Sequence, residues 1–217
     1  MSRCPTVRAD VAVVGSGPNG LAAALLCARA GREVVVVEAM DTTGGGCRTI
    51  PLDVPDGLGD GLMVDQCSAV HPMAAASPFF RYFDLAAHGG DLVTPPVQLA
   101  HALPGRDAIV VPAGPSHSSL AEGFGSRAEA DRWSGVMAPL GSRAEDVVGV
   151  ALSDQRTLPP VAATAALAAA FVRTHPRPGP ADPLGPDGRT LLSGIAAHAI
   201  TPLTSPAATG VGLVLGA

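Results

Sequence analysis

The chain has 217 residues, of which 47% are hydrophobic and 3% aromatic, and its formal net charge is −5. This length suits one domain or two small ones and is enough to bury a core. The acidic balance and the absence of any run of Lys or Arg exclude the basic face of a nucleic-acid binder and a polybasic membrane patch.

The cysteines and apolar segments indicate the compartment. Cys4, Cys27, Cys47 and Cys67 form no CxxC pair and no zinc-type cluster with histidine, so we expect reduced thiols and no metal site. The first ten residues lack the apolar core of a signal peptide, and the apolar stretch at 161–172 is too short to span a membrane. We therefore expect a cytoplasmic chain without a transmembrane segment.

The first forty residues have the pattern of a β-α-β unit. Residues 10–14 and 33–38 are apolar, β-branched runs typical of buried parallel strands. Between them, residues 21–30 form a predicted helix that ends at Gly31. The predicted fold class is α/β, with a Rossmann-like segment at the N-terminus.

The turn GSGPNG, residues 15–20, joins the first strand to the helix. Gly15 permits a tight turn, Gly17 lets a diphosphate approach the backbone, and Gly20 allows the helix to pack on the sheet. The helix N-terminus offers free N–H groups to phosphates. We therefore expect Gly15, Gly17, Pro18, Asn19 and Gly20 to contact a dinucleotide.

Glu38 follows Gly20 by 18 residues and ends the second strand. Its carboxylate can accept hydrogen bonds from both hydroxyls of an adenosine ribose, and its charge would repel a 2′-phosphate. The pattern therefore favours FAD or NAD over NADP. We place the next residue, Ala39, in the same cofactor contact.

A third motif, GGGCRT at 44–49, follows the acidic residue. Small residues let the backbone touch a cofactor, and Arg48 supplies a cation for a diphosphate. Together, GSGPNGLAAA, VVVVEA and GGGCRT resemble the FAD-dependent oxidoreductases of the phytoene desaturase and amine oxidase group. That resemblance implies FAD as cofactor, with Gly44, Gly45, Gly46 and Arg48 along its diphosphate.

The segment DQCSAVHPMAAASPFFRYFDL, residues 65–85, resembles the phytoene-desaturase-like branch, which includes the pyridine nucleotide-disulfide oxidoreductase domain-containing proteins. The resemblance implies that His71 lies near the flavin, where it could act as a base. The alternative is that His71 only caps a turn before Pro72. Asp65 could orient this loop.

The remainder of the chain is predicted to be mainly helical. We expect residues 1–75 to be the FAD-binding segment and 76–217 to be part of a mixed α+β substrate or cap domain. The expected elements are a loop at 41–62 with a strand at 62–64, a helix from Ser77-Pro78 to Ala87, a hairpin of 97–101 with 108–111, capping boxes at Ser119 and Ser126, helices at 144–152, 161–172, 190–200 and from 206, and a loop at 174–188.

The resemblance implies an oxidoreductase that passes a hydride from a small apolar substrate to FAD. Members of the group are about twice as long, so the chain resembles an N-terminal half whose C-terminal half, or a partner chain, is missing. One alternative is a non-catalytic truncated fragment or nucleotide-binding subunit. Another is an NAD-dependent dehydrogenase, against which the GGGCRT motif argues.

Overall fold

A computed structural model describes residues 7–52, 61–114, 116–152, 154, 156–157, 159–175 and 182–217. The chain divides into two compact units, residues 1–71 and 72–217. Each unit has its own secondary structure and is described by itself. In the described part of the chain, no helix is both long and apolar enough to cross a membrane.

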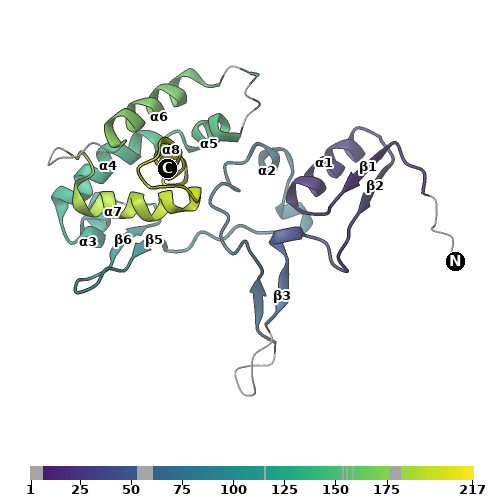
Figure 1. Cartoon of the computed structure of the whole chain (residues 1–217), viewed down its shortest axis with the longest axis horizontal. Helices are drawn as coiled ribbons and strands as arrows, with labels where there is room; N and C mark the ends of the chain where they lie inside the picture. The colour runs from purple at the N-terminus through teal and green to yellow at the C-terminus, as the bar shows by residue number, and fades with distance from the viewer. Residues whose placement is uncertain are drawn as a thin grey trace. The chain divides into compact units, whose positions relative to one another are not determined.

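The first unit begins with a parallel β-α-β unit (Figure 1). Strand β1 (Val11–Val14) pairs with β2 (Val34–Val37), and Val11 lies opposite Val34. Helix α1 (Pro18–Arg29) connects them and packs on both strands. It starts earlier than the sequence predicts because Pro18, with its fixed φ, suits the first helical position.

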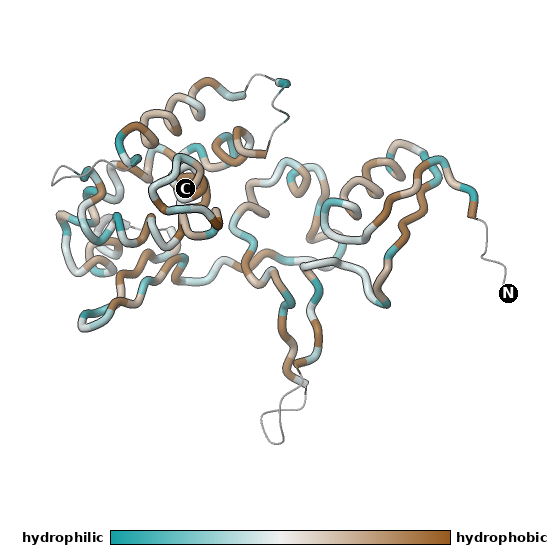
Figure 2. Tube along the Cα trace, viewed as in Figure 1, coloured by the Kyte–Doolittle hydropathy of each residue, from teal (hydrophilic) through white to brown (hydrophobic). Residues whose placement is uncertain are grey.

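The β1–β2 pair has the apolar composition expected of a buried parallel sheet (Figure 2), but its residues are half-buried or exposed, so the expected full burial is not observed. Ala24, one turn after Gly20, is the buried residue of α1, the helix that packs on these strands. Both strands end with an exposed valine, Val14 and Val37. The predicted strand–turn–helix–strand order is confirmed, and it brings the carboxyl ends of both strands to one edge.

A short hairpin follows β2 in the chain. The turn η1 (Gly45–Cys47) leads into β3 (Thr49–Pro51), which pairs antiparallel with β4 (Met63–Asp65). The prediction of a structureless loop at 41–62 is therefore wrong for 45–51. Local composition did not reveal β3 because this strand is stabilised by backbone pairing with a segment distant in the sequence.

The second unit combines an antiparallel hairpin with a helical bundle (Figure 1). Strands β5 (Val97–His101) and β6 (Ile109–Pro112) form the hairpin. The helices are α2 (Pro78–Tyr82), η2 (Ala86–His88), α3 (His117–Phe124), α4 (Arg127–Gly141), α5 (Ala144–Leu152), α6 (Val161–Thr174), α7 (Gly185–Ala196), η3 (Ala197–Ala199) and α8 (Pro206–Leu215).

The core of this second unit lies where the helices meet the hairpin. Trp133, Leu140, Leu184 and Leu213 are almost fully buried there, together with Ile109 of β6. Burial of each such side chain contributes about 1.5–3 kcal/mol. The hairpin and helices therefore share one hydrophobic core.

Helix boundaries in this unit differ from the predictions. The helix expected from Ser77-Pro78 to Ala87 is two short pieces, α2 and η2, because the backbone is extended at Phe83. Helix α7 starts at Gly185 instead of residue 190. The helix that the sequence predicts from the Ser126 capping box to about Met137 continues as α4 to Gly141, although it contains Pro139.

Of the two predicted capping boxes, the one at Ser119 is wrong. Helix α3 starts before it, and the Ser116 hydroxyl caps the helix by accepting the Ser119 N–H at 3.1 Å. Ser126 does cap α4 by accepting the Glu129 N–H. The Glu129 carboxylate, however, accepts the Asp187 N–H at 3.3 Å in α7.

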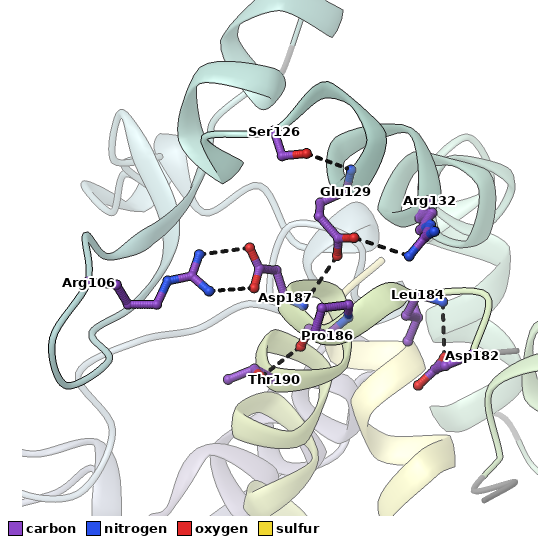
Figure 3. A network of polar contacts seen from close by, with 9 residues as sticks. All are labelled: Arg106, Ser126, Glu129, Arg132, Asp182, Leu184, Pro186, Asp187 and Thr190. Carbon is purple, nitrogen blue, oxygen red and sulfur yellow. Dashed lines mark hydrogen bonds and ion pairs between the residues drawn. The ribbon is translucent and has the colours of Figure 1, made fainter. Parts of the chain in front are cut away.

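Figure 3 shows a polar network around that contact. Arg106, in the β5–β6 turn, donates two hydrogen bonds of 2.7 and 2.8 Å to the Asp187 carboxylate. Glu129 also pairs with Arg132 at 3.2 Å. The network joins the hairpin turn to the N-termini of α4 and α7. We assign it a structural role, since its charged groups are paired with one another.

Candidate dinucleotide-binding site

Two glycines of the turn after β1 are required by the fold itself. Gly15 has φ +92°, a conformation that other residues rarely adopt. A Cβ on Gly20 would overlap the Gly15 carbonyl oxygen. The first turn of α1 therefore lies directly against the loop that precedes it.

Gly17 has no such internal requirement. Its φ is −68°, and an added Cβ would have Gly45 Cα as its nearest neighbour, at an ordinary 3.9 Å. Gly17 is the N-cap of α1, and no side chain caps the helix. The N–H groups of Asn19 and Gly20 belong to the first turn, which lacks intrahelical acceptors. A small residue and free N–H groups thus occur together where an anion would bind.

The GGGCRT segment lies against this loop. The Gly44 N–H donates to the Ser16 carbonyl oxygen at 2.9 Å. A Cβ on Gly45, which has φ +57°, would come within 2.9 Å of Gly17 Cα. Two glycine-rich segments separated by more than twenty residues are therefore in direct backbone contact, as a shared ligand site requires.

Arg48 closes the second segment. Its Nε donates to the Gly45 carbonyl oxygen at 3.0 Å, and Nη1 donates to Thr42 Oγ1 at 3.4 Å. These bonds hold the guanidinium beside the 44–47 turn. Arginine has five N–H donors in a planar fork, so donors remain for a bound anion.

Glu38 stands immediately after β2 and faces the glycine loop. Its Oε2 accepts the Ser16 hydroxyl at 2.6 Å and the Ser16 N–H at 2.8 Å, and its Oε1 accepts the Met40 N–H at 3.0 Å. These bonds lower the pKa of Glu38 to about 2, and the bond from the Ser16 hydroxyl has the largest effect. The adjacent Ala39 N–H contributes weakly in the same direction. Glu38 is therefore an anion at neutral pH, and Oε1 retains capacity for a further donor.

Replacing Ser16 by alanine should raise the Glu38 pKa from about 2 toward its ordinary value of 4.5, because the strongest hydrogen bond is removed. In the folded parent chain the Glu38 pKa is lower than in the unfolded chain. Ionised Glu38 therefore stabilises the folded state fully above pH 4.5, and this stabilisation is lost as the pH falls toward 2. A carboxyl ¹³C NMR titration measures both chains. An unchanged Glu38 pKa in Ser16→Ala would contradict the assignment, and Ser116→Ala is the control.

A third segment joins the site through the hairpin. Thr49 donates its hydroxyl to Asp65 Oδ1 at 2.7 Å, and the Cys67 N–H donates to the Gly46 carbonyl oxygen at 3.2 Å. His71 is exposed at the end of the first unit, with its Nδ1 3.5 Å from Ser68 Oγ. Its proposed role as a base has no support from a contact with the glycine loop or Glu38 among the described residues.

Ser16 is the residue that sequence reasoning missed. Its side chain is 1% exposed, and it donates twice to Glu38. No role for this serine was predicted from the sequence. A hydroxyl between two glycines, followed later by an acidic strand end, is the signal that could have revealed the pair.

Residues 13–84 match the family described as NAD(P)-binding Rossmann-like domain. This part of the chain has a Rossmann-like fold. The match includes the end of β1, the glycine turn, Glu38 and the GGGCRT segment. The predicted α/β fold class is thereby confirmed for the N-terminal part.

Curated relatives match short N-terminal stretches of the chain. The hydroxyneurosporene desaturase of Rhodobacter capsulatus is 51% identical over 51 residues, 24% of this chain and 10% of that protein. The menaquinone reductase of Mycolicibacterium smegmatis is 72% identical over 32 residues, 15% and 8% respectively. The ferredoxin–NADP reductase of Gluconacetobacter diazotrophicus is 36% identical over 55 residues, 25% and 16%.

These matched stretches span a sixth or less of each relative's length. Within them, the predicted resemblance to the desaturase and oxidoreductase group is confirmed. No solved structure is significantly similar to the chain.

Proposed function

We propose that the chain is the dinucleotide-binding part of an FAD-dependent oxidoreductase, which passes a hydride from a small apolar substrate to FAD. The observation that carries this proposal is Gly17. It lies at the uncapped N-terminus of α1 and in contact with the GGGCRT segment, yet no internal contact requires it to be glycine. A diphosphate that approaches the backbone accounts for the missing side chain.

The charge at Glu38 favours FAD or NAD as the ligand. Its carboxylate, with a pKa of about 2, remains ionised at neutral pH and would repel the 2′-phosphate of NADP. The GGGCRT segment then favours FAD over NAD, because it supplies a second glycine turn and a cation beside the first. A simple NAD site needs only one such loop.

Each residue has a distinct part in holding FAD. The first-turn N–H groups of α1, at Asn19 and Gly20, and the guanidinium of Arg48 would bind the diphosphate. Glu38 would accept the ribose hydroxyls, with Oε1 the oxygen that has room for a donor. When bound, the flavin supplies the hydride acceptor. The chain's own residues orient the cofactor and balance its charge.

The apolar substrate is inferred from the relatives. Their names identify one as a desaturase of hydroxyneurosporene and another as a reductase of menaquinone. The second unit, with its helical core beside a hairpin, is the part we assign to the substrate or cap region. In this assignment, residues 1–75 bind FAD and 76–217 belong to a domain completed by a further segment or partner chain.

The visible spectrum of the purified chain tests the cofactor. We expect flavin bands, and release of about one FAD per chain on denaturation. A chain that stays colourless after incubation with FAD would overturn the proposal. A yellow chain whose flavin bleaches with dithionite but with no apolar donor would instead favour the non-catalytic nucleotide-binding subunit.

A further inference from the structure

Two cysteines lie on segments that are hydrogen-bonded to each other where the GGGCRT segment enters the hairpin. The pairing of β3 with β4 continues beyond the strands, because the Gln66 N–H donates to the Arg48 carbonyl oxygen at 2.8 Å. One residue further, the Cys67 N–H donates to the Gly46 carbonyl oxygen at 3.2 Å. Cys47 is therefore flanked by two residues that both bond to the segment carrying Cys67.

This pairing sets the distance between the cysteines. The Gly46 oxygen lies next to the Cα of Cys47 across one trans peptide, so its bond to the Cys67 nitrogen limits the two cysteine Cα atoms to about 7 Å. Disulfides usually join Cα atoms about 4.4–6.8 Å apart. The Cys67 Sγ also lies 4.0 Å from the Cβ position of Gly46, so this thiol faces the turn that contains Cys47.

The neighbouring cross-strand pair has side chains in contact. Thr49 lies opposite Asp65, and their side-chain oxygens are 2.7 Å apart. Cys47 is the last residue of η1, two residues before Thr49, and Cys67 lies two residues after Asp65. Both thiols are free and both residues are exposed. The two sulfurs can therefore approach each other and are accessible to a small oxidant.

We propose that Cys47 and Cys67 form a reversible disulfide in exchange with a low-molecular-weight disulfide such as oxidised glutathione. One thiolate attacks the small disulfide, which forms a mixed disulfide and releases one small thiol. The second cysteine then attacks the protein sulfur and releases the second small thiol. The cysteine pair loses two electrons and two protons, and the small disulfide gains them as two thiols.

The bridge would constrain the 44–47 turn. This turn contacts Gly17 and donates to the Ser16 oxygen, so a covalent tie from Cys47 to the hairpin restricts the same backbone that forms the glycine loop contact. The disulfide is inferred from the geometry of the hairpin alone, so it does not depend on which dinucleotide binds.

Peptide mapping of the 217-residue chain tests the bridge. After equilibration in oxidising glutathione buffer and acid quenching, trypsin places Cys47 in a peptide ending at Arg48 and Cys67 in one ending at Arg81. We expect these two peptides to be linked, with a loss of two mass units from the intact monomer. Dithiothreitol should separate them, and Cys47→Ser and Cys67→Ser should each abolish the link.

Two controls distinguish a disulfide that the folded hairpin directs from random pairing of the cysteines. Cys27→Ser should retain the link, because Cys27 lies in α1 and has no part in it. A chain unfolded in guanidinium should give mixed pairings that include Cys4. Persistent free or glutathionylated thiols at both positions, linkage between two chains, or equal linkage in the unfolded chain would overturn the proposal.

Discussion

Replacing Gly20 by alanine is expected to destabilise the N-terminal unit by about 3 kcal/mol, the upper range for overpacking. The new Cβ would overlap the Gly15 carbonyl oxygen, a backbone atom of the loop before the helix. Neither atom can rotate away, so α1 must move from the strands that it covers. Amide hydrogen exchange of Val11–Val14 and Val34–Val37 measures the loss.

Gly17→Ala is the matched control for Gly20→Ala. Its Cβ meets nothing closer than Gly45 Cα at 3.9 Å, and its φ of −68° suits alanine. We expect unchanged amide protection but an affinity for FAD at least about tenfold lower, because the methyl group occupies the diphosphate approach. Equal destabilisation by both substitutions would contradict the distinct roles given to these glycines.

Replacing Glu38 by lysine should lower the affinity for FAD on the order of 100-fold, since a charge-assisted acceptor becomes a donor. Lysine cannot accept the ribose hydroxyls, nor the Ser16 and Met40 N–H groups that Glu38 accepts. The glycine loop therefore loses a ligand contact and its own support. Fluorescence quenching of FAD on titration with each variant measures the change.

Glu38→Gln separates the charge from the shape. Glutamine retains one carbonyl acceptor for the Ser16 N–H, so we expect an affinity between those of the parent chain and Glu38→Lys. Because Glu38 has a pKa of about 2, it stays ionised between pH 5 and 8. Titration of Glu38 should therefore not change the affinity of the parent chain for FAD in this pH range. Equal FAD affinity in all three chains would show that Glu38 does not contact the ribose.

The parts of the site that follow local backbone rules were predictable from the sequence. Gly15 needs its positive φ and Pro18 suits the first helical position, and each restricts the chain within one or two residues of itself. The strand–turn–helix–strand order follows from these constraints and from apolar periodicity. Glu38 could be located because it directly follows the second strand.

The parts that depend on distant partners were not predictable. β3 exists because Thr49 and its neighbours pair with a segment more than ten residues away. Ser116, not Ser119, caps α3, although only Ser119 has a glutamate three residues later. The Glu129 carboxylate accepts the Asp187 N–H instead of the N–H of the N-cap serine. This contact forms only because α4 packs on α7. Such contacts are set by tertiary packing.

We propose that the glycine loop, Glu38 and the GGGCRT segment together form a site for FAD. Isothermal titration of the purified 217-residue chain with FAD, NAD and NADP tests it most directly. We predict one FAD per chain, bound more tightly than NAD, with NADP weakest because Glu38 repels its 2′-phosphate. Binding of NADP as tight as that of FAD, or no binding of FAD, would contradict the account.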